Sequence, residues 1–311
     1  MSTQMTPAQS RVVDPILSNH VRGYTNQEYV GRVMAPRVDV GTRGFRVIKF
    51  DRDSFKNAAK APRRAPGAAI PRVQFGFQSD PIALYQEALA GQVPIENQEE
   101  AAAVPGIDLQ MNTAATTMDI IQLREEVETS QLLTDPANYG ADNKLALVGT
   151  DKWNNDASKP KEVINEAREQ IRLKIGRYPN RAIISPGAFN ALDQHPLIRD
   201  QFKYTSSESL SEAMIARYFG LDQVKIGKAV YVGDDDVEHD CWDNCMVLGF
   251  VHGAANPGMP AFSYTYGLRG YPLARAVWWD ANTESWVGPV LDERRPYIVG
   301  ADAGFLIQTP V

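Results

Sequence analysis

The chain has 311 residues, a net charge of −6, and a composition that is 43% hydrophobic and 23% charged, which is the ordinary balance of a globular protein with one large or two modest domains. The acidic charge argues against a dedicated nucleic-acid binder, because such proteins present a basic surface to phosphates. Two cysteines exclude a disulfide framework, no window is apolar enough to span a membrane, and the N-terminus lacks a secretion-signal pattern. We therefore expect a soluble, cytosolic protein.

The N-terminal region differs from the rest in pattern and charge. Residues 1–42 mix Pro, Gly, Asn and isolated apolar residues without a period, which predicts an extended arm. Residues 43–72 hold nine Lys or Arg against two Asp, a net charge of +7; since residues 1–42 carry +1, residues 73–311 carry −14. Strand patterns at 44–52 and 74–77 flank a Pro-, Gly- and Ala-rich segment, and this predicts a long hairpin with a flexible basic tip.

The longest predicted helix covers residues 108–134, where neither Gly nor Pro occurs. Met111, Ala115 and Met118 recur there at helical spacing. At 1.5 Å per residue such a helix is roughly 40 Å long, which is more than a small domain needs. It ends at the turn signal Asp135-Pro136.

A compact mixed segment is predicted next, followed by strands. Pro160 suits the first turn of a second amphipathic helix, with Val163, Ala167, Ile171 and Ile175 on one face. The other predicted elements are a strand at 181–184, a helix starting at Ser185-Pro186, a helix at 209–219, and strands at 224–232, 246–251, 262–266, 277–279 and 303–308. This order predicts an α+β fold and not an alternating βα architecture.

Several segments resemble a pattern common in the major capsid proteins of tailed bacteriophages. Residues 153–202 contain a Trp and a polar turn, a helix, Gly-x-x-Pro-Asn, an apolar strand, and a helix that ends in Leu-x-x-His-Pro. The residues that fit, in order, are Gly176, Pro179, Asn180, Leu192, His195 and Pro196. DNCMVLGF at 243–250 and the closing ADAGFLIQTPV are similar to later parts of that pattern.

The resemblance implies the Hong Kong 97 phage fold. It assigns an N-terminal arm to 1–42, an E-loop hairpin to 43–78, a peripheral domain to 79–150 with its spine helix at 108–134, an axial domain to 151–252, and C-terminal strands that complete the peripheral domain to 253–311. An arm and a loop without a core are costly to order in a monomer. They make physical sense when they lie on neighbouring subunits.

The resemblance also implies function and partners. The chain would self-assemble into hexamers and pentamers of an icosahedral head around packaged double-stranded DNA, which it would touch non-specifically. A scaffolding protein and a portal would take part in procapsid assembly in the host cytoplasm, a decoration protein is a further partner that the resemblance allows, and the mature location would be the virion. The chain starts without a long helical extension, so we expect a separate scaffold. We expect no catalysis, cofactor, metal or membrane contact.

Charge segregation leads to a hypothesis about contacts between subunits. The basic loop would cross onto a neighbouring subunit and meet acidic side chains there, which would fix register more than add affinity. A solvated loop and an inner surface that touches DNA are the alternatives. The basic candidates are Arg43, Arg46, Lys49, Arg52, Lys56, Lys60, Arg63, Arg64 and Arg72. The acidic candidates are Glu96, Glu99, Glu100, Glu125, Glu126 and Glu128.

Two groups of residues could bind metal. For the first we favour ordinary reduced cysteines and surface histidines, and for the second a solvated acidic turn. His239, Cys241, Cys245 and His252 have no known zinc spacing. The run Asp234, Asp235, Asp236, Glu238 and Asp240 lacks the Gly and distal Glu of a calcium loop. Lys56 beside Asn57 is similar to the Lys–Asn cross-link of some capsid proteins, but sequence cannot show the convergence that the reaction needs.

Two other functions stay open at this point. An encapsulin has the same fold and stores an enzyme as cargo, so cargo protein in place of DNA inside particles would identify it. A cytosolic α+β enzyme could use the Cys and His cluster and would form a small oligomer. Against the enzyme, the chain has no Gly-x-Ser-x-Gly, His-Glu-x-x-His or phosphate-binding Gly-x-x-x-x-Gly-Lys motif, and only four histidines.

Overall fold

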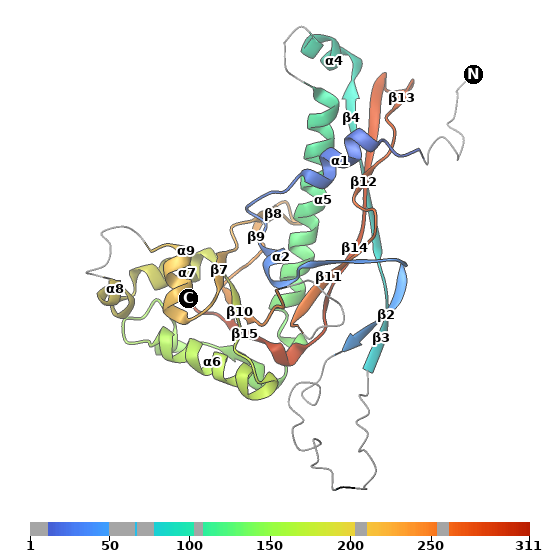
Figure 1. Cartoon of the computed structure of the whole chain (residues 1–311). Coiled ribbons are helices and arrows are strands. Elements are labelled where there is room, and N and C mark those ends of the chain that lie inside the picture. The colour runs from blue at the N-terminus through green and yellow to red at the C-terminus, as the bar shows by residue number, and fades with distance from the viewer. Residues whose placement is uncertain (1–11, 50–65, 67–77, 103–107, 203–209, 254–260) are drawn as a thin grey trace.

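The computed structural model describes residues 12–49, 66, 78–102, 108–202, 210–253 and 261–311, and these form two parts of different shape (Figure 1). We call 12–134 together with 261–298 the elongated part, and 135–253 together with 299–311 the compact part. Within the described ranges, no helix combines the length and the apolar character that crossing a membrane requires.

The elongated part is built on one long helix and one long strand that run side by side (Figure 1). Its elements are α1 (Pro15–Gly23), α2 (Gly31–Met34), β1 (Arg37–Val40), β2 (Gly44–Lys49), β3 (Gln78–Ala83), β4 (Tyr85–Pro94), α4 (Ile95–Ala102), α5 (Leu109–Thr134), β11 (Ser263–Leu268), β12 (Leu273–Ala274), β13 (Trp278–Asp280) and β14 (Ser285–Ile298).

Helix α5 confirms the predicted long helix. The side chain of Asp108 caps it by accepting hydrogen bonds from the backbone N of Gln110 and of Met111. The helix packs on β4 and β14. Close approach depends on Gly91 of β4, where an added Cβ would lie 2.2 Å from Cγ2 of Thr113.

Strand β14 is the centre of a six-stranded sheet and was not predicted. It pairs with β4 along ten residues, from Ser285 opposite Pro94 to Arg294 opposite Tyr85, and with β11, β12 and β13 on its other side. No described strand pairs with the outer edge of β4. The charges and two prolines inside β14 conceal its pattern. Strand β2 lies within the strand predicted at 44–52 and pairs antiparallel with β3, which was not predicted. The strand predicted at 74–77 lies outside the described residues.

The described part of the predicted arm needs a correction. Residues 12–42 contain two short helices and a strand, and they pack on their own subunit. Leu17 and Val21 lie against α5 and β12 in one apolar cluster, and Met34 lies in the main core. The helices are too short to produce a sustained sequence period, which is why the pattern suggested an extended chain.

The compact part surrounds a five-stranded sheet in the order β5-β15-β10-β6-β7. Its helices and strands are β5 (Lys144–Ala146), α6 (Pro160–Ile175), β6 (Arg181–Ile184), α7 (Pro186–Gln194), α8 (Pro196–Phe202), α9 (Glu212–Phe219), β7 (Gln223–Ile226), β8 (Val230–Val232), β9 (Glu238–Asp240), β10 (Cys245–Gly249) and β15 (Gly304–Gln308). Short 3-10 turns cover Pro136–Asn138, Ala141–Asn143, Gly149–Asp151 and Ala301–Ala303. One continuous apolar core fills this part.

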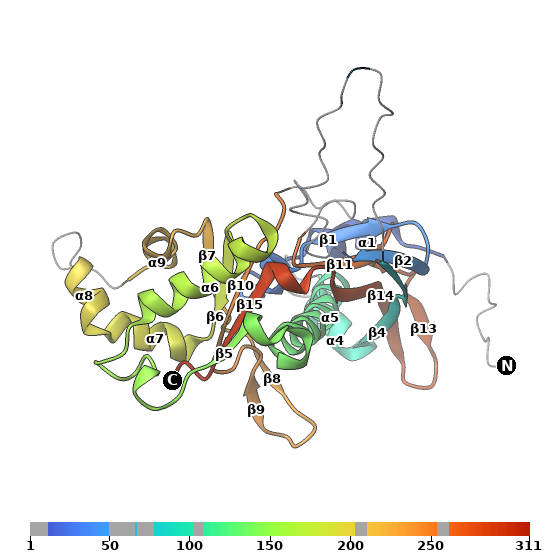
Figure 2. The ribbon, with the colours of Figure 1, turned by 90° about the horizontal axis from the view of Figure 1, so that it is seen from below.

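Most predicted elements of the compact part are confirmed, with two corrections. The strand predicted at 224–232 is two strands, separated near Gly227, where an added Cβ would lie 2.3 Å from Cδ1 of Trp242. The closing strand β15 pairs with β10, so it completes the compact sheet and not the sheet of the elongated part. Seen along its length the molecule is a slab, and the β8–β9 hairpin projects from the opposite side of α5 from β1 (Figure 2).

Candidate functional site

A charged segment lies in the middle of β14. Asp292, Glu293 and Arg294 are consecutive, and each is at most 1% exposed. Because successive residues of a strand point to opposite faces, Asp292 and Arg294 face α5 and Glu293 faces away from it. Buried charges are costly unless they are paired, so the partners of these residues define the site.

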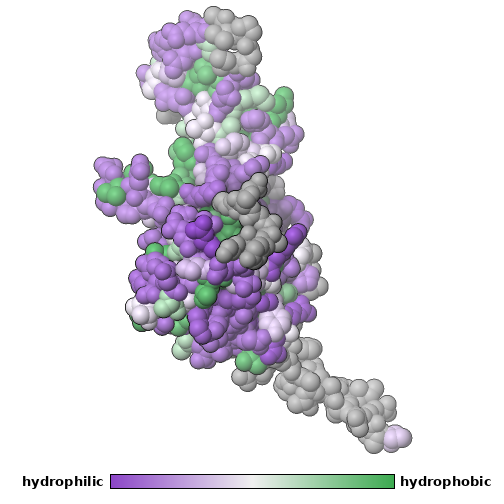
Figure 3. Space-filling view, turned by 90° about the vertical axis from the view of Figure 1, so that its left-hand side faces the viewer, coloured by the Kyte–Doolittle hydropathy of each residue, from purple (hydrophilic) through white to green (hydrophobic). Residues whose placement is uncertain are grey.

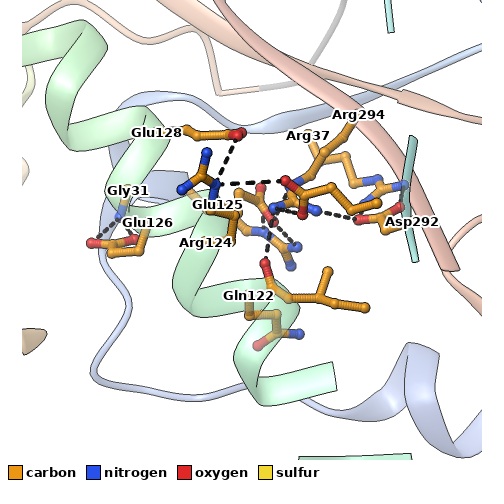
Figure 4. Close-up of polar contacts among 12 residues, drawn as sticks. Gly31, Arg37, Gln122, Arg124, Glu125, Glu126, Glu128, Asp292 and Arg294 are labelled. Atoms are coloured by element: carbon orange, nitrogen blue, oxygen red, sulfur yellow. Dashed lines mark hydrogen bonds and ion pairs between the residues drawn. The ribbon is translucent and has the colours of Figure 1, made fainter. Parts of the chain in front are cut away.

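Arg294 is at the centre of these contacts (Figure 4). Its Nη2 lies 2.7 Å from Oε2 of Glu87 on β4 and donates to the backbone O of Ile121 on α5 at 2.8 Å. Its Nε lies 3.5 Å from Oε2 of Glu125, and its Nη1 lies 3.5 Å from Oδ2 of Asp292. One guanidinium group therefore joins two strands to the long helix.

Two arginines from the N-terminal segment complete the arrangement. Nε and Nη2 of Arg32 donate to Oε1 and Oε2 of Glu125 at 3.1 and 2.7 Å. Nη1 and Nη2 of Arg37 each donate to Asp292 at 3.0 Å, and Nη2 also donates to the backbone O of Tyr271 at 3.1 Å. Paired contacts of this geometry are among the strongest in proteins. Arg32 thus fastens the N-terminal segment to α5, and Arg37 fastens it to β14.

Three guanidinium groups and three carboxylates form what we call the charge cluster. Burial alone would raise the pKa of Glu125, but the charges of Arg32 and Arg294 outweigh burial and hold the pKa below its ordinary value. For Glu87 burial outweighs the attraction of Arg294, so the pKa of Glu87 is raised. The lowered pKa favours the carboxylate form of Glu125, which binds Arg32 and Arg294 from α5. The members are Arg32, Arg37, Glu87, Glu125, Asp292 and Arg294.

The next residue of α5 joins the two parts of the molecule. Oε1 of Glu126 accepts hydrogen bonds from the backbone N of Val30 and of Gly31 at 3.0 Å, and from the indole Nε1 of Trp242 at 2.6 Å. An added Cβ at Gly31 would lie 2.8 Å from Oε2 of Glu126. Burial raises the pKa of Glu126 despite these donors. Since Trp242 belongs to the compact part, Glu126 links that part to α5 and α2.

On the other face of β14, Glu293 holds the root of the predicted basic hairpin. Nε and Nη2 of Arg43 donate to Oε2 and Oε1 of Glu293 at 2.6 and 2.8 Å, and Nε2 of Gln86 donates to Oε1 at 3.1 Å. The hydrogen bonds from Arg43 lower the pKa of Glu293 and outweigh its burial. Because Arg43 directly precedes β2, this contact fixes where the hairpin leaves the sheet.

The structure describes few of the predicted basic contact residues. Arg43 is used within its own subunit, Arg46 is exposed on β2, and Lys49 is the last residue of that strand. The contact between subunits therefore stays a prediction for most of the loop. The candidates outside the described residues are Arg52, Lys56, Lys60, Arg63, Arg64 and Arg72, together with Asn57.

The predicted acidic contacts divide into exposed and buried residues. Glu96, Glu99 and Glu100 are exposed on α4. Glu125 and Glu126 need a correction, because they are 4% and 3% exposed and bind groups of their own subunit. They are therefore not available to a neighbour's loop. The remaining candidate, Glu128, is half-buried and forms an ion pair with Arg124, whose Nε lies 3.3 Å from Oε1.

The alternative metal groups are not assembled in the described structure. Cys241 and Cys245 are buried free thiols, and burial raises the pKa of each to about 12, which disfavours the thiolate that binds metals. Nε2 of His239 lies 3.1 Å from Oδ1 of Asp235. Among the residues that the structure describes, no three His, Cys, Asp or Glu side chains converge as a metal ion would need.

Sequence reasoning did not predict most of the charge cluster. Arg32, Arg37, Glu87, Asp292 and Arg294 were absent from the candidate contacts. The one available signal is the run Asp-Glu-Arg-Arg at 292–295, which stands between apolar residues on both sides. Charge inside an otherwise apolar segment suggests paired burial, but it does not identify the partners.

Comparisons with known proteins agree along nearly the whole chain. Residues 127–261 match the family model "Phage major capsid protein E". A major capsid protein of Burkholderia phage BcepMu is 32% identical over 304 residues, which is 96% of each chain. A solved phage-related protein of Bordetella bronchiseptica has a TM-score of 0.84 and 34% identity over 97% of this chain and 99% of that one. An encapsulin of Synechococcus elongatus, with a TM-score of 0.58 and 11% identity over 93% and 89%, shares the fold alone.

Proposed function

The chain belongs to the phage major capsid proteins and forms the icosahedral shell of a phage head with the Hong Kong 97 fold, and from this premise we propose how its two parts divide the work of assembly. The compact part acts as a body built around the main apolar core, to which α2 and α5 contribute Met34 and Leu133. The elongated part acts as a strut that neighbouring subunits complete. The family is structural, and we assign no catalytic role to any residue.

The observation that supports this division is the exposed edge of the elongated part at β4. Strand β4 is ten residues long, has no described partner on its outer edge, and exposes Tyr85 and Leu89. A long free edge is unusual in a protein that works as a monomer. In a shell, such an edge and its face can lie against neighbouring subunits.

The domain boundaries remain a proposal, and we move the start of the axial domain from residue 151, as proposed from sequence, to residue 135. We propose a hairpin over 43–78, a peripheral domain built on α5 and β14, and an axial domain over 135–252. This change is supported by the pairing of β15 with β10 and with β5, which brings residues 144–146 and 304–308 into the sheet of the compact part.

The basic loop is proposed to reach the tip of a neighbouring subunit. α4, with exposed Glu96, Glu99 and Glu100, lies at one end of the elongated part, and β2 and β3, the root of the loop, lie toward the other end (Figure 1). Within one subunit these regions are far apart, so pairing needs two copies. Assembly rate measured against salt concentration tests this: R63E/R64E should slow assembly and weaken its salt dependence, and unchanged behaviour would contradict the contact.

The proposed partners follow from the family. The shell would enclose double-stranded DNA, and a scaffolding protein and a portal would act during assembly in the host cytoplasm. Electron microscopy of the purified chain, alone and coexpressed with neighbouring phage genes, tests self-assembly. Shells or capsomers are expected, and a uniform monomer or dimer in every condition would contradict the function. If purified particles contain an enzyme cargo in place of DNA, the encapsulin alternative is favoured.

A further inference from the structure

A groove lies between α5 and the β8–β9 hairpin, outside the charge cluster. Its volume is about 700 Å³. One wall follows α5 at positions i, i+3 and i+7, a row along which another helix can pack. The other wall is the hairpin. The residues that define the two walls are Ile120, Leu123 and Val127 on α5, and Tyr231, Val232 and Asp235 on the hairpin.

The groove and the hairpin expose apolar side chains. Ile120 is 51% exposed, Val232 63% and Val237 51%. Hydrophobic side chains gather where the projecting hairpin joins the body of the molecule (Figure 3). A two-stranded hairpin is marginally stable in water by itself, and exposed apolar patches commonly mark sites of association. The groove therefore has the character of an interface.

The charge around the groove selects the partner. The hairpin turn carries Asp234, Asp235 and Asp236, and the first two of these line the groove. Asp235 contacts His239 of the same hairpin, whose Nε2 lies 3.1 Å from its Oδ1, and on the opposite wall Arg124 forms an ion pair with Glu128. The lining thus holds two aspartates against one arginine. The groove is therefore net acidic, so it repels DNA phosphates and attracts basic groups.

The position of the groove separates this partner from neighbouring subunits. The hairpin projects from one broad face of the slab, on the opposite side of α5 from β1 (Figure 2). In a shell one subunit thick, neighbours meet at the edges of the slab, whereas a broad face points into or out of the shell. The groove is thus open to a protein that is not part of the layer.

We propose that this groove binds a basic, amphipathic segment of the scaffolding protein. The inference rests on the proposed function, because it needs a shell with a co-assembling partner. Apolar side chains of the segment would cover Ile120, Leu123 and Val232, and its Lys or Arg side chains would face Asp234 and Asp235. The groove would then be filled during assembly and vacated when the partner leaves.

The first test compares two double variants in cells that coexpress the phage assembly genes. I120K/V232K removes apolar surface from the groove and reverses its charge. V148K/L173K is the matched control, because Val148 and Leu173 are 68% and 54% exposed and lie outside the groove. Mass spectrometry of purified shells should show at least about tenfold less of one co-assembled protein in the groove variant and no loss in the control. Equal content in both would overturn the proposal.

A second test covers the case in which the groove variant forms no shells. A photoreactive benzoylphenylalanine at position 232 should cross-link, in unassembled subunits as in shells, to a net-positive segment of that co-assembled protein. Cross-links only to a second copy of this chain, or to DNA, would overturn the proposal. Cross-linking to the basic segment without shells from any variant would support the groove and count against the proposed function alone.

Discussion

The two parts of the molecule are stabilised by different means. In the compact part, one apolar core that includes Trp153 and Trp242 surrounds the sheet. The elongated part shares this core only where it adjoins the compact part, through residues such as Met34 and Leu133. Along the rest of its length it has two smaller apolar clusters, and charged side chains pack between α5 and β14. The fully buried charged side chains of the described chain are all there: Glu125, Glu126, Asp292, Glu293 and Arg294. A thin strut cannot bury enough apolar area, so paired charges fix its geometry.

This difference predicts which mutations destabilise each part most. Loss of one methylene group from an apolar core costs about 0.5 to 1.5 kcal/mol, because its transfer free energy is lost and a small cavity remains. Loss of one member of a buried charge cluster leaves its partners unpaired and costs more than the pair itself contributes. The elongated part should therefore respond strongly to single charge changes and to pH.

Arg294→Met is expected to give the largest effect. Glu87, Glu125 and Asp292 would lose their shared guanidinium group, and the unfolding free energy should fall by about 3 to 5 kcal/mol. Urea unfolding of the unassembled chain measures this. Arg295→Met, at the next residue, is the control and should cost less than about 1 kcal/mol. Similar costs for both variants would mean that the charge cluster is not what fixes the strut.

Glu125→Gln should change how the unfolding free energy depends on pH in the acidic range. Since the folded pKa of Glu125 lies below its ordinary value of 4.5, its contribution is complete above that value and is lost as the pH falls through the folded pKa. The variant should be less stable at neutral pH, and its unfolding free energy should not show the decrease at acid pH that Glu125 causes. The pKa of Glu126 is raised, so protonation of Glu126 on mild acidification increases the unfolding free energy. Glu126→Gln should remove this increase. Unfolding curves at several pH values would show both, and parallel curves would contradict the pKa directions.

Ile183→Val probes the compact part in the same way. Ile183 lies in β6 and is fully buried, and loss of one methylene group should cost about 0.5 to 1.5 kcal/mol with no change in pH dependence. Hydrogen exchange should show reduced protection in the compact sheet and unchanged protection in α5. If protection in α5 falls equally, the two parts unfold as one unit.

Replacement of Glu96, Glu99 and Glu100 by Gln should have the smallest effect on the subunit. These side chains are exposed on α4, so unfolding of the unassembled chain should not change measurably. Assembly should become slower and less sensitive to salt if α4 receives the basic loop. Light scattering against salt concentration measures this, and an unchanged salt response would place the loop elsewhere.

Elements with local signals were predictable. Asp108 caps α5 and no Gly or Pro interrupts it, Pro160 opens α6, and Ser185 caps α7 by accepting from the backbone N of Ala188. Strand β14 was missed because Pro289, Pro296 and four charges in succession do not follow the pattern of an ordinary strand. The arm was misjudged because its helices depend on packing against distant residues.

The sequence by itself determined the α+β class, the positions of most helices, the uneven distribution of charge, and the family resemblance, because each depends on residues near one another in the chain or on their order. Only the tertiary structure decided which charges are buried and with which partners. Arg37 and Asp292 are 255 positions apart, and Glu126 meets Trp242 across 116 positions. Pairing energy depends on distance in space and on burial, and neither can be read from spacing along the chain.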